Sequence, residues 1–150
     1  MQLDLTYLPA QDRLSLSVRG KAHWLLTRSL TIRLVSAWVA KLQEVDLPKV
    51  GFALGQRDVG QEHALSLEFD GPKNIATPPE PAARAKLLEE INLTVDALGS
   101  KLVFRGQGQE MAMNLTRKES HLLLEMIGKR ARDALWLEPV QWPQWLGVAN

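Results

Sequence analysis

The tripeptide Leu-Thr-Arg occurs twice in the chain, at residues 26–28 and 115–117, and both copies lie at the same kind of junction. A segment in which polar and apolar residues alternate precedes each copy. A long segment with apolar residues at every third or fourth position follows it. The first pattern is typical of a half-buried strand and the second of an amphipathic helix. We therefore expect each copy to mark the change from a strand to a helix.

The surroundings of the two junctions indicate an internal duplication. At an offset of 88 residues, Leu5 aligns with Leu93, and at an offset of 89 the two tripeptides align. Two further alternating segments precede each junction, at about 3–7 and 13–19 in the first half and 91–95 and 101–105 in the second. The predicted fold class is α+β, with duplicated β-meander–helix units of about three strands and one long helix each. Its antiparallel sheet should carry the helices on one face.

Threonine residues mark the expected helix starts. Thr27 can cap a helix that runs from residue 28 to about 45, because its hydroxyl can accept from a free N–H of the first turn. Thr116 is followed three residues later by Glu119, which is the spacing of a capping box. The second helix should then extend to about Leu135.

The chain length of 150 residues fits one domain, which we assign to residues 1–150. We divide it into a first repeat at 1–45, a connector at 46–90, and a second repeat with a tryptophan-rich tail at 91–150. Within the connector, alternation over residues 63–69 predicts an additional strand, and a proline-rich linker follows it at 77–81.

Composition excludes several classes of function. The chain contains no cysteine, which excludes disulfides, thiolate catalysis and cysteine-ligated metals. Its net charge of +1 is not that of a polycation. The N-terminus lacks the pattern of a signal peptide, and no stretch approaches the roughly 20 apolar residues of a membrane span. We therefore expect a soluble cytoplasmic protein without a membrane partner.

The sheet face opposite the helices is the first candidate binding surface. Strand alternation places there the polar residues of both repeats, and His23 should face the same way. The remaining outward residues of this prediction are Asp4, Thr6, Asn92, Thr94 and Val103. The candidate binding residues on this face are Arg13, Ser15, Ser17, Arg19, Lys101 and Arg105.

Two kinds of partner fit such a face. Rows of hydroxyl and guanidinium groups suit a single-stranded nucleic acid, and the order of strands and helices is similar to that of the duplicated single-strand binders of the Whirly or Pur type. Stacking of bases on aromatic side chains contributes ~1–3 kcal/mol per base to such binding, but alternation places no aromatic residue on this face. We therefore predict a protein partner or self-association, with nucleic acid as the alternative ligand.

The second candidate surface is the C-terminal tail. Three of the five tryptophans lie within ten residues, at Trp136, Trp142 and Trp145. Tryptophan is enriched at the centres of protein interfaces, so Trp142 and Trp145 are candidate docking residues in a homo-oligomer. The other interpretation is that the tail packs over its own core, because a monomer rarely exposes several tryptophans together.

The sequence offers no pattern of residues that would support catalysis. The three histidines, His23, His63 and His121, lack metal-binding spacing, and Glu125 lies one helical turn after His121, where a surface pair is expected. No serine lies in the sequence context of an activated nucleophile. We predict neither a metal nor a cofactor. The functional hypothesis is a non-enzymatic binding or assembly protein.

Overall fold

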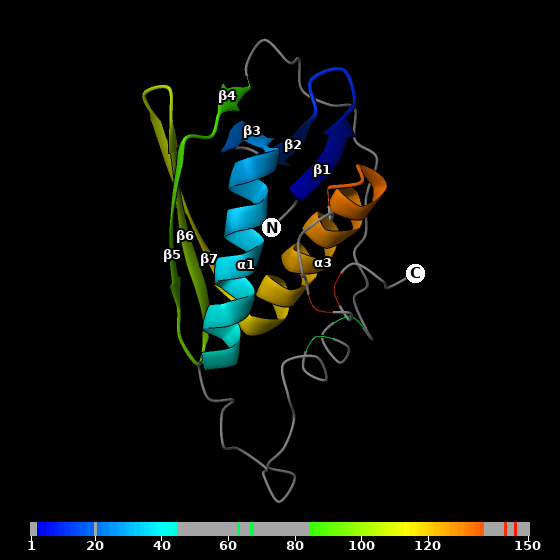
Figure 1. Ribbon diagram of the computed structural model, residues 1–150. Helices are drawn as coiled ribbons and strands as arrows, with labels where there is room; N and C mark the ends of the chain where they lie inside the picture. Colours follow the sequence, from blue (N-terminus) through cyan, green and yellow to red (C-terminus); the bar gives the residue numbers. More distant parts are fainter. Residues whose placement is uncertain are drawn as a thin grey trace, which may run out of the picture.

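The computed structural model describes residues 3–19, 21–44, 63, 67, 85–136, 143 and 146. Within these residues the strands form a four-stranded and a three-stranded sheet, and Figure 1 shows long helices packed against them. The first repeat contains β1 (Leu3–Leu8), β2 (Arg13–Val18), β3 (Ala22–Thr27) and α1 (Arg28–Glu44). The second repeat contains β5 (Glu90–Val95), β6 (Gly99–Gly106), β7 (Gln109–Thr116) and α3 (Arg117–Asp133).

The two repeats have the same order of elements. Each begins with three antiparallel strands that pair in sequence order, and each continues into a helix of 17 residues. Helix α3 starts and ends 89 positions after α1, which is the offset of the Leu-Thr-Arg copies. The predicted α+β fold with two β-meander–helix units is confirmed.

Both predicted threonine caps are present. The Oγ1 atom of Thr27 accepts from the backbone N–H of Leu30 at 3.3 Å. At the second helix, Thr116 Oγ1 accepts from the N–H of Glu119 at 3.1 Å, and Glu119 Oε1 accepts from the N–H of Thr116 at 3.0 Å. These bonds satisfy donors that an isolated helix end would leave without partners.

A short parallel strand connects the two sheets. Strand β4 (Lys86–Leu87) pairs with β3 at the edge of the first sheet. The next two residues form hydrogen bonds to different sheets. Leu88 N–H donates to Leu25 O of β3 at 2.9 Å, and Glu89 N–H donates to Arg105 O of β6 at 2.9 Å. Gly106 permits the close approach of this segment to β6, because a Cβ atom there would overlap the carbonyl oxygen of Leu87.

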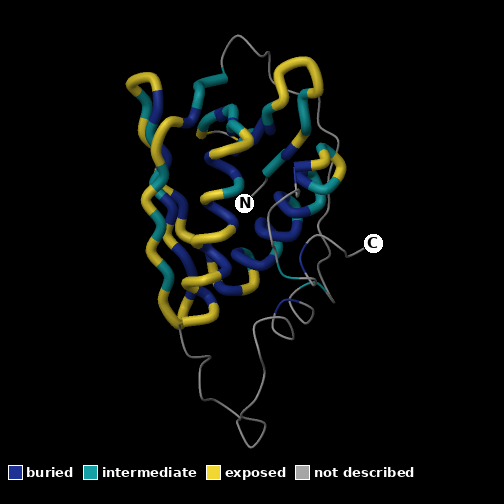
Figure 2. The backbone as a smooth tube through the Cα atoms, in the orientation of Figure 1, coloured by how far each residue is buried: buried dark blue, intermediate teal, exposed yellow. Residues whose placement is uncertain are grey.

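The helices share one core between the two sheets. Helix α1 packs against β3 and β5, whereas α3 packs against β1, β6 and β7. Each helix therefore contacts strands of both repeats. Trp24 of β3 and Phe104 of β6 meet edge to face across the sheets, with ring centroids 6.0 Å apart. The residues of β2, β6 and β7 that point toward the helices are mostly buried (dark blue in Figure 2), whereas those of β5 are half-buried.

The predicted strand over residues 63–69 is wrong where the structure describes that segment. His63 and Leu67 both have helical backbone. His63 and Leu67 are four positions apart, which is also the spacing of residues on one face of a helix. The contacts that His63 makes with α3 are long-range, and they outweigh the local strand pattern.

Among the described residues, none of the helices is long and apolar enough to cross a membrane.

Candidate functional site

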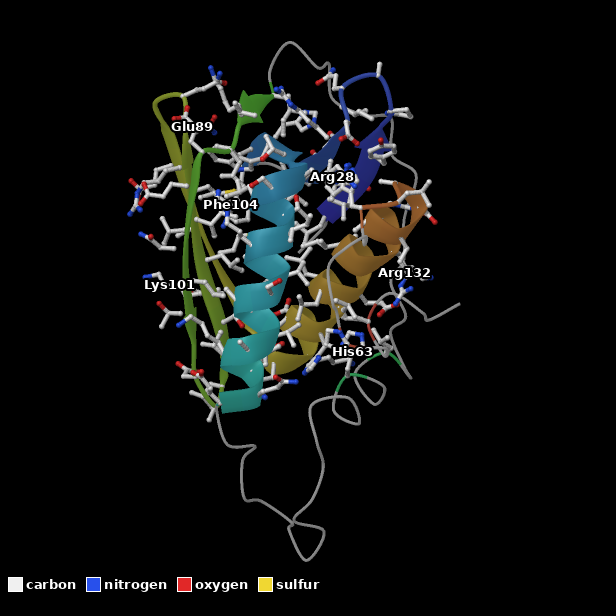
Figure 3. All side chains as sticks on the ribbon, viewed as in Figure 1. Arg28, His63, Glu89, Lys101, Phe104 and Arg132 are labelled. Atoms are coloured by element: carbon white, nitrogen blue, oxygen red, sulfur yellow. The ribbon has the colours of Figure 1, made fainter. Side chains whose placement is uncertain are left out.

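The side of the β5–β6–β7 sheet that points away from both helices is open to solvent. Successive strand residues point to opposite sides, and Leu102, Phe104 and Met113 fill the buried side. Figure 3 shows Phe104 pointing toward α1 and Lys101 pointing away from it. We call the exposed side the outer face. Its members are Glu90, Asn92, Thr94, Lys101, Val103, Arg105, Glu110, Ala112 and Asn114.

Strand register arranges the outer face in three rows that run across the strands. The acidic row is Glu90, Arg105 and Glu110; the central row is Asn92, Val103 and Ala112; the basic row is Thr94, Lys101 and Asn114. Neighbouring rows are about 7 Å apart, because two residues along a strand span that distance. The outward positions expected for Asn92, Thr94, Lys101, Val103 and Arg105 agree with this arrangement.

The charges of the outer face cancel. Arg105 lies between two carboxylates, with Nη2 at 3.4 Å from Glu110 Oε1 and Nη1 at 4.0 Å from Glu90 Oε1. Within the described part of the chain, Lys101 has no ion-pair partner. Two glutamates and two cations thus give the face a net charge of zero. The outer face has no excess of positive charge that would attract phosphates.

The corresponding face of the first sheet is less open. Ser15 is buried, and its hydroxyl bonds to Nε2 of His23, which is also buried. His23 does lie on the predicted side of β3, because it stands opposite Ser17 in the register. Arg13 and Ser17 are half-buried, whereas Arg19 is exposed. The structure therefore places the predicted residues of the two repeats on two separate surfaces.

A serine bonded to a histidine can act as a pair of nucleophile and general base in catalysis. Catalysis requires the serine oxygen to reach a substrate and an oxyanion site near it. Ser15 is 8% exposed and lies in the middle of strand β2. The contact between Ser15 and His23 is better explained as a bond that satisfies two buried polar groups.

The first tryptophan of the C-terminal tail packs against the first repeat. Trp136 is fully buried, and its indole Nε1 donates to Asp12 Oδ1 at 2.7 Å. Its ring meets Tyr7 edge to face, and the Tyr7 hydroxyl donates to the same carboxylate oxygen at 2.8 Å. Trp142 and Trp145 lie outside the described residues.

The Asp12 contacts shift two pKa values. The hydrogen bond from Trp136, together with that from Tyr7, holds the pKa of Asp12 below its ordinary value. The hydrogen bond to the Asp12 carboxylate raises the pKa of Tyr7 above its ordinary value. Both shifts favour the ionised carboxylate and the protonated phenol, which are the forms that make these bonds.

A buried group of titratable side chains joins His63 to helix α3. Nε2 of His63 lies 2.8 Å from Glu125 Oε1, and Nδ1 of His63 lies 2.9 Å from Nδ1 of His121. All three residues are buried, so the expected surface pair of His121 and Glu125 is wrong. Nε2 of His63 and Oε1 of Glu125 therefore share one hydrogen bond, and the two Nδ1 atoms share another.

We call His63, His121 and Glu125 the buried triad. Its hydrogen bonds fix the orientation of both imidazoles and fasten the helical residue His63 to α3. Among the described residues, no group of three or more His, Cys, Asp or Glu side chains could hold a metal ion. The geometry therefore supports a structural connection. Gly128, three residues after Glu125 on α3, is also buried.

Comparison with known proteins gives no match to a family model, to a curated protein or to a solved structure.

Proposed function

We propose that this chain is a non-enzymatic binding and assembly protein, and that its outer face contacts a protein partner. The observation that supports the proposal is the combination of exposure and charge balance on that face. It is an open, regular sheet surface with small and uncharged side chains in the central row and opposite charges in the flanking rows. Protein interfaces typically have a weakly charged centre and a polar rim.

The magnitudes favour protein over nucleic acid. Binding of a single strand depends on several phosphate contacts and on base stacking of ~1–3 kcal/mol per aromatic side chain. The outer face carries no aromatic residue, and Arg105 is already engaged by Glu90 and Glu110. Lys101 is left as the main phosphate contact, and one contact contributes little to affinity at physiological salt.

Site-specific photo-crosslinking tests the proposal. A photoreactive amino acid is introduced at Asn92 on the outer face, in cells that express the chain. A matched variant carries the same group at Arg33, which is exposed on α1. We expect protein cross-links from position 92 and few from position 33.

Two results would count against the proposed function. Cross-linking of position 92 mainly to nucleic acid would favour the alternative ligand. Equal yields of protein cross-links from positions 92 and 33 would indicate random collision and would remove the special role of the outer face.

A further inference from the structure

We infer that the outer face docks on the outer face of a second copy of this chain, in a face-to-face dimer with twofold symmetry. The inference rests on the proposed function and names the partner at the same surface. It is carried by the order of charges along the strands. The acidic row has two carboxylates and one guanidinium, the central row has no charge, and the basic row has one ammonium group.

A twofold axis that runs close to the central row makes the net charges of the facing rows complementary, because the acidic row is net negative and the basic row is net positive. Rotation about an axis in the interface, within about 15° of the perpendicular to the strands, places the acidic row of one copy over the basic row of the other. The same rotation places the basic row of the first copy over the acidic row of the second copy. The dimer therefore contains this contact twice. The alternative axis, parallel to the strands, would place like rows together and repel.

The central row allows the two sheets to approach. Stacked sheets are about 10 Å apart, and the side chains between them must interdigitate. Val103 and Ala112 are small or apolar, and Asn92 is uncharged, so no charge is buried at the centre. Val103 of each copy lies near the axis.

The sideways alignment of the two sheets places Lys101 near carboxylates of the opposite copy. Rotation alone sets Lys101 over Arg105 of the second copy, with Glu90 and Glu110 on either side. Packed sheets cross at about 30°. Each flanking row lies ~7 Å from the axis, so this crossing shifts the facing rows sideways by about 3–4 Å relative to each other. Lys101 is thereby displaced from Arg105 toward one of its two glutamates.

The size of the outer face sets the strength of the dimer. Three strands at ~4.8 Å spacing and three rows at ~7 Å give a patch of only about 14 by 20 Å. That area is well below the roughly 800 Å² per partner of a stable interface. We therefore expect a weak dimer that forms reversibly as the concentration rises.

Charge reversal provides a specific test by sedimentation equilibrium. Lys101→Glu is one variant, and Glu90→Lys with Glu110→Lys is the other. Each alone gives the facing rows net charges of the same sign in both contacts of the dimer, and we expect association to weaken at least ~10-fold. In an equimolar mixture, opposite charges face each other in both contacts, and association should return. Arg33→Glu on α1 is the matched control, and it should associate like the unmodified chain.

The results separate this inference from the proposed function. A mass that rises toward twice the chain mass, is lost in each variant and returns in the mixture supports the face-to-face dimer. An unmodified chain that stays monomeric at several hundred micromolar, or a mixture that fails to associate, overturns it. If position 92 still cross-links to other proteins in that case, the proposed function stands and only the second copy is excluded.

Discussion

Replacing Glu125 with leucine should destabilise the fold by breaking the buried triad. Glu125 Oε1 lies 2.8 Å from His63 Nε2, and the two side chains are 0% and 2% exposed. Removing one member of a buried hydrogen-bonded pair costs about 3–5 kcal/mol when charge is left behind, and about 1–3 kcal/mol when a neutral donor loses its acceptor. We expect Glu125→Leu to lower the free energy of unfolding by about 3 kcal/mol, between these two cases.

A double-mutant cycle separates the pair from the rest of the site. Glu125→Gln keeps an oxygen acceptor at the same position and should cost less than Glu125→Leu. His63→Leu alone leaves the carboxylate of Glu125 without its imidazole partner. The double variant His63→Leu/Glu125→Leu removes both groups. Its loss should be smaller than the sum of the single losses by at least about 1 kcal/mol.

Urea denaturation followed by circular dichroism measures these losses, and thermal unfolding provides a check. For a chain of this size, a loss of 3 kcal/mol corresponds to a fall in Tm of about 6–12 °C. Single losses that add to within about 0.5 kcal/mol would mean that His63 and Glu125 do not interact. That result would refute the docking of the helical residue His63 on α3.

Three further predictions concern single positions. Leu135 has a left-handed backbone (φ 60°) and is 80% exposed. Leu135→Gly should therefore leave the free energy of unfolding unchanged or raise it by up to ~1 kcal/mol. A loss greater than ~1 kcal/mol in urea denaturation would mean that its side chain packs. Gly106→Ala should cost about 1–3 kcal/mol by overpacking against the Leu87 carbonyl, and an unchanged urea midpoint would contradict the close approach there. The folded pKa of Asp12 is lowered, so Asp12 stabilises the fold above its unfolded pKa of ~3.9, and this contribution is lost as pH falls through the folded value. Between about pH 5 and pH 2, the free energy of unfolding from urea titrations should fall less for Asp12→Asn than for the unmodified chain. Equal falls in the two proteins would mean that the contact with Trp136 contributes nothing to stability.

Local patterns in the sequence were sufficient to predict the repeated elements. Thr27 and Thr116 cap helices because a hydroxyl before an apolar-striped segment has a nearby backbone donor to bond. Alternation assigns the two faces of each strand because side chains change side at every residue. The same rule also places Glu90 and Glu110 on the outer face. Their carboxylates could therefore have been predicted, and with them the neutral charge of that surface.

The buried triad could not be predicted because it depends on contacts between segments far apart in the chain. His63 and Glu125 are separated by 62 residues, and His63 lies in a segment whose alternation resembles a strand. A histidine and a glutamate one turn apart on a helix are usually exposed. Their burial follows only when another segment covers that side of α3. The burial of Ser15 could not be predicted for the same reason. Strand alternation indicates the side of the sheet to which Ser15 points, but not whether another segment covers that side.

Carboxylate labelling tests the central claim, that a protein partner covers the outer face, most directly. A carbodiimide and an amine label exposed acids in a concentrated extract of expressing cells and, separately, in the dilute purified chain. Glu90 and Glu110 lie on the outer face, and Glu44 at the end of α1 is an exposed control. The account predicts slower labelling of Glu90 and Glu110 in the extract, with the rate at Glu44 unchanged. Equal rates at all three positions in the two samples, or protection of Glu44 alone, would contradict it.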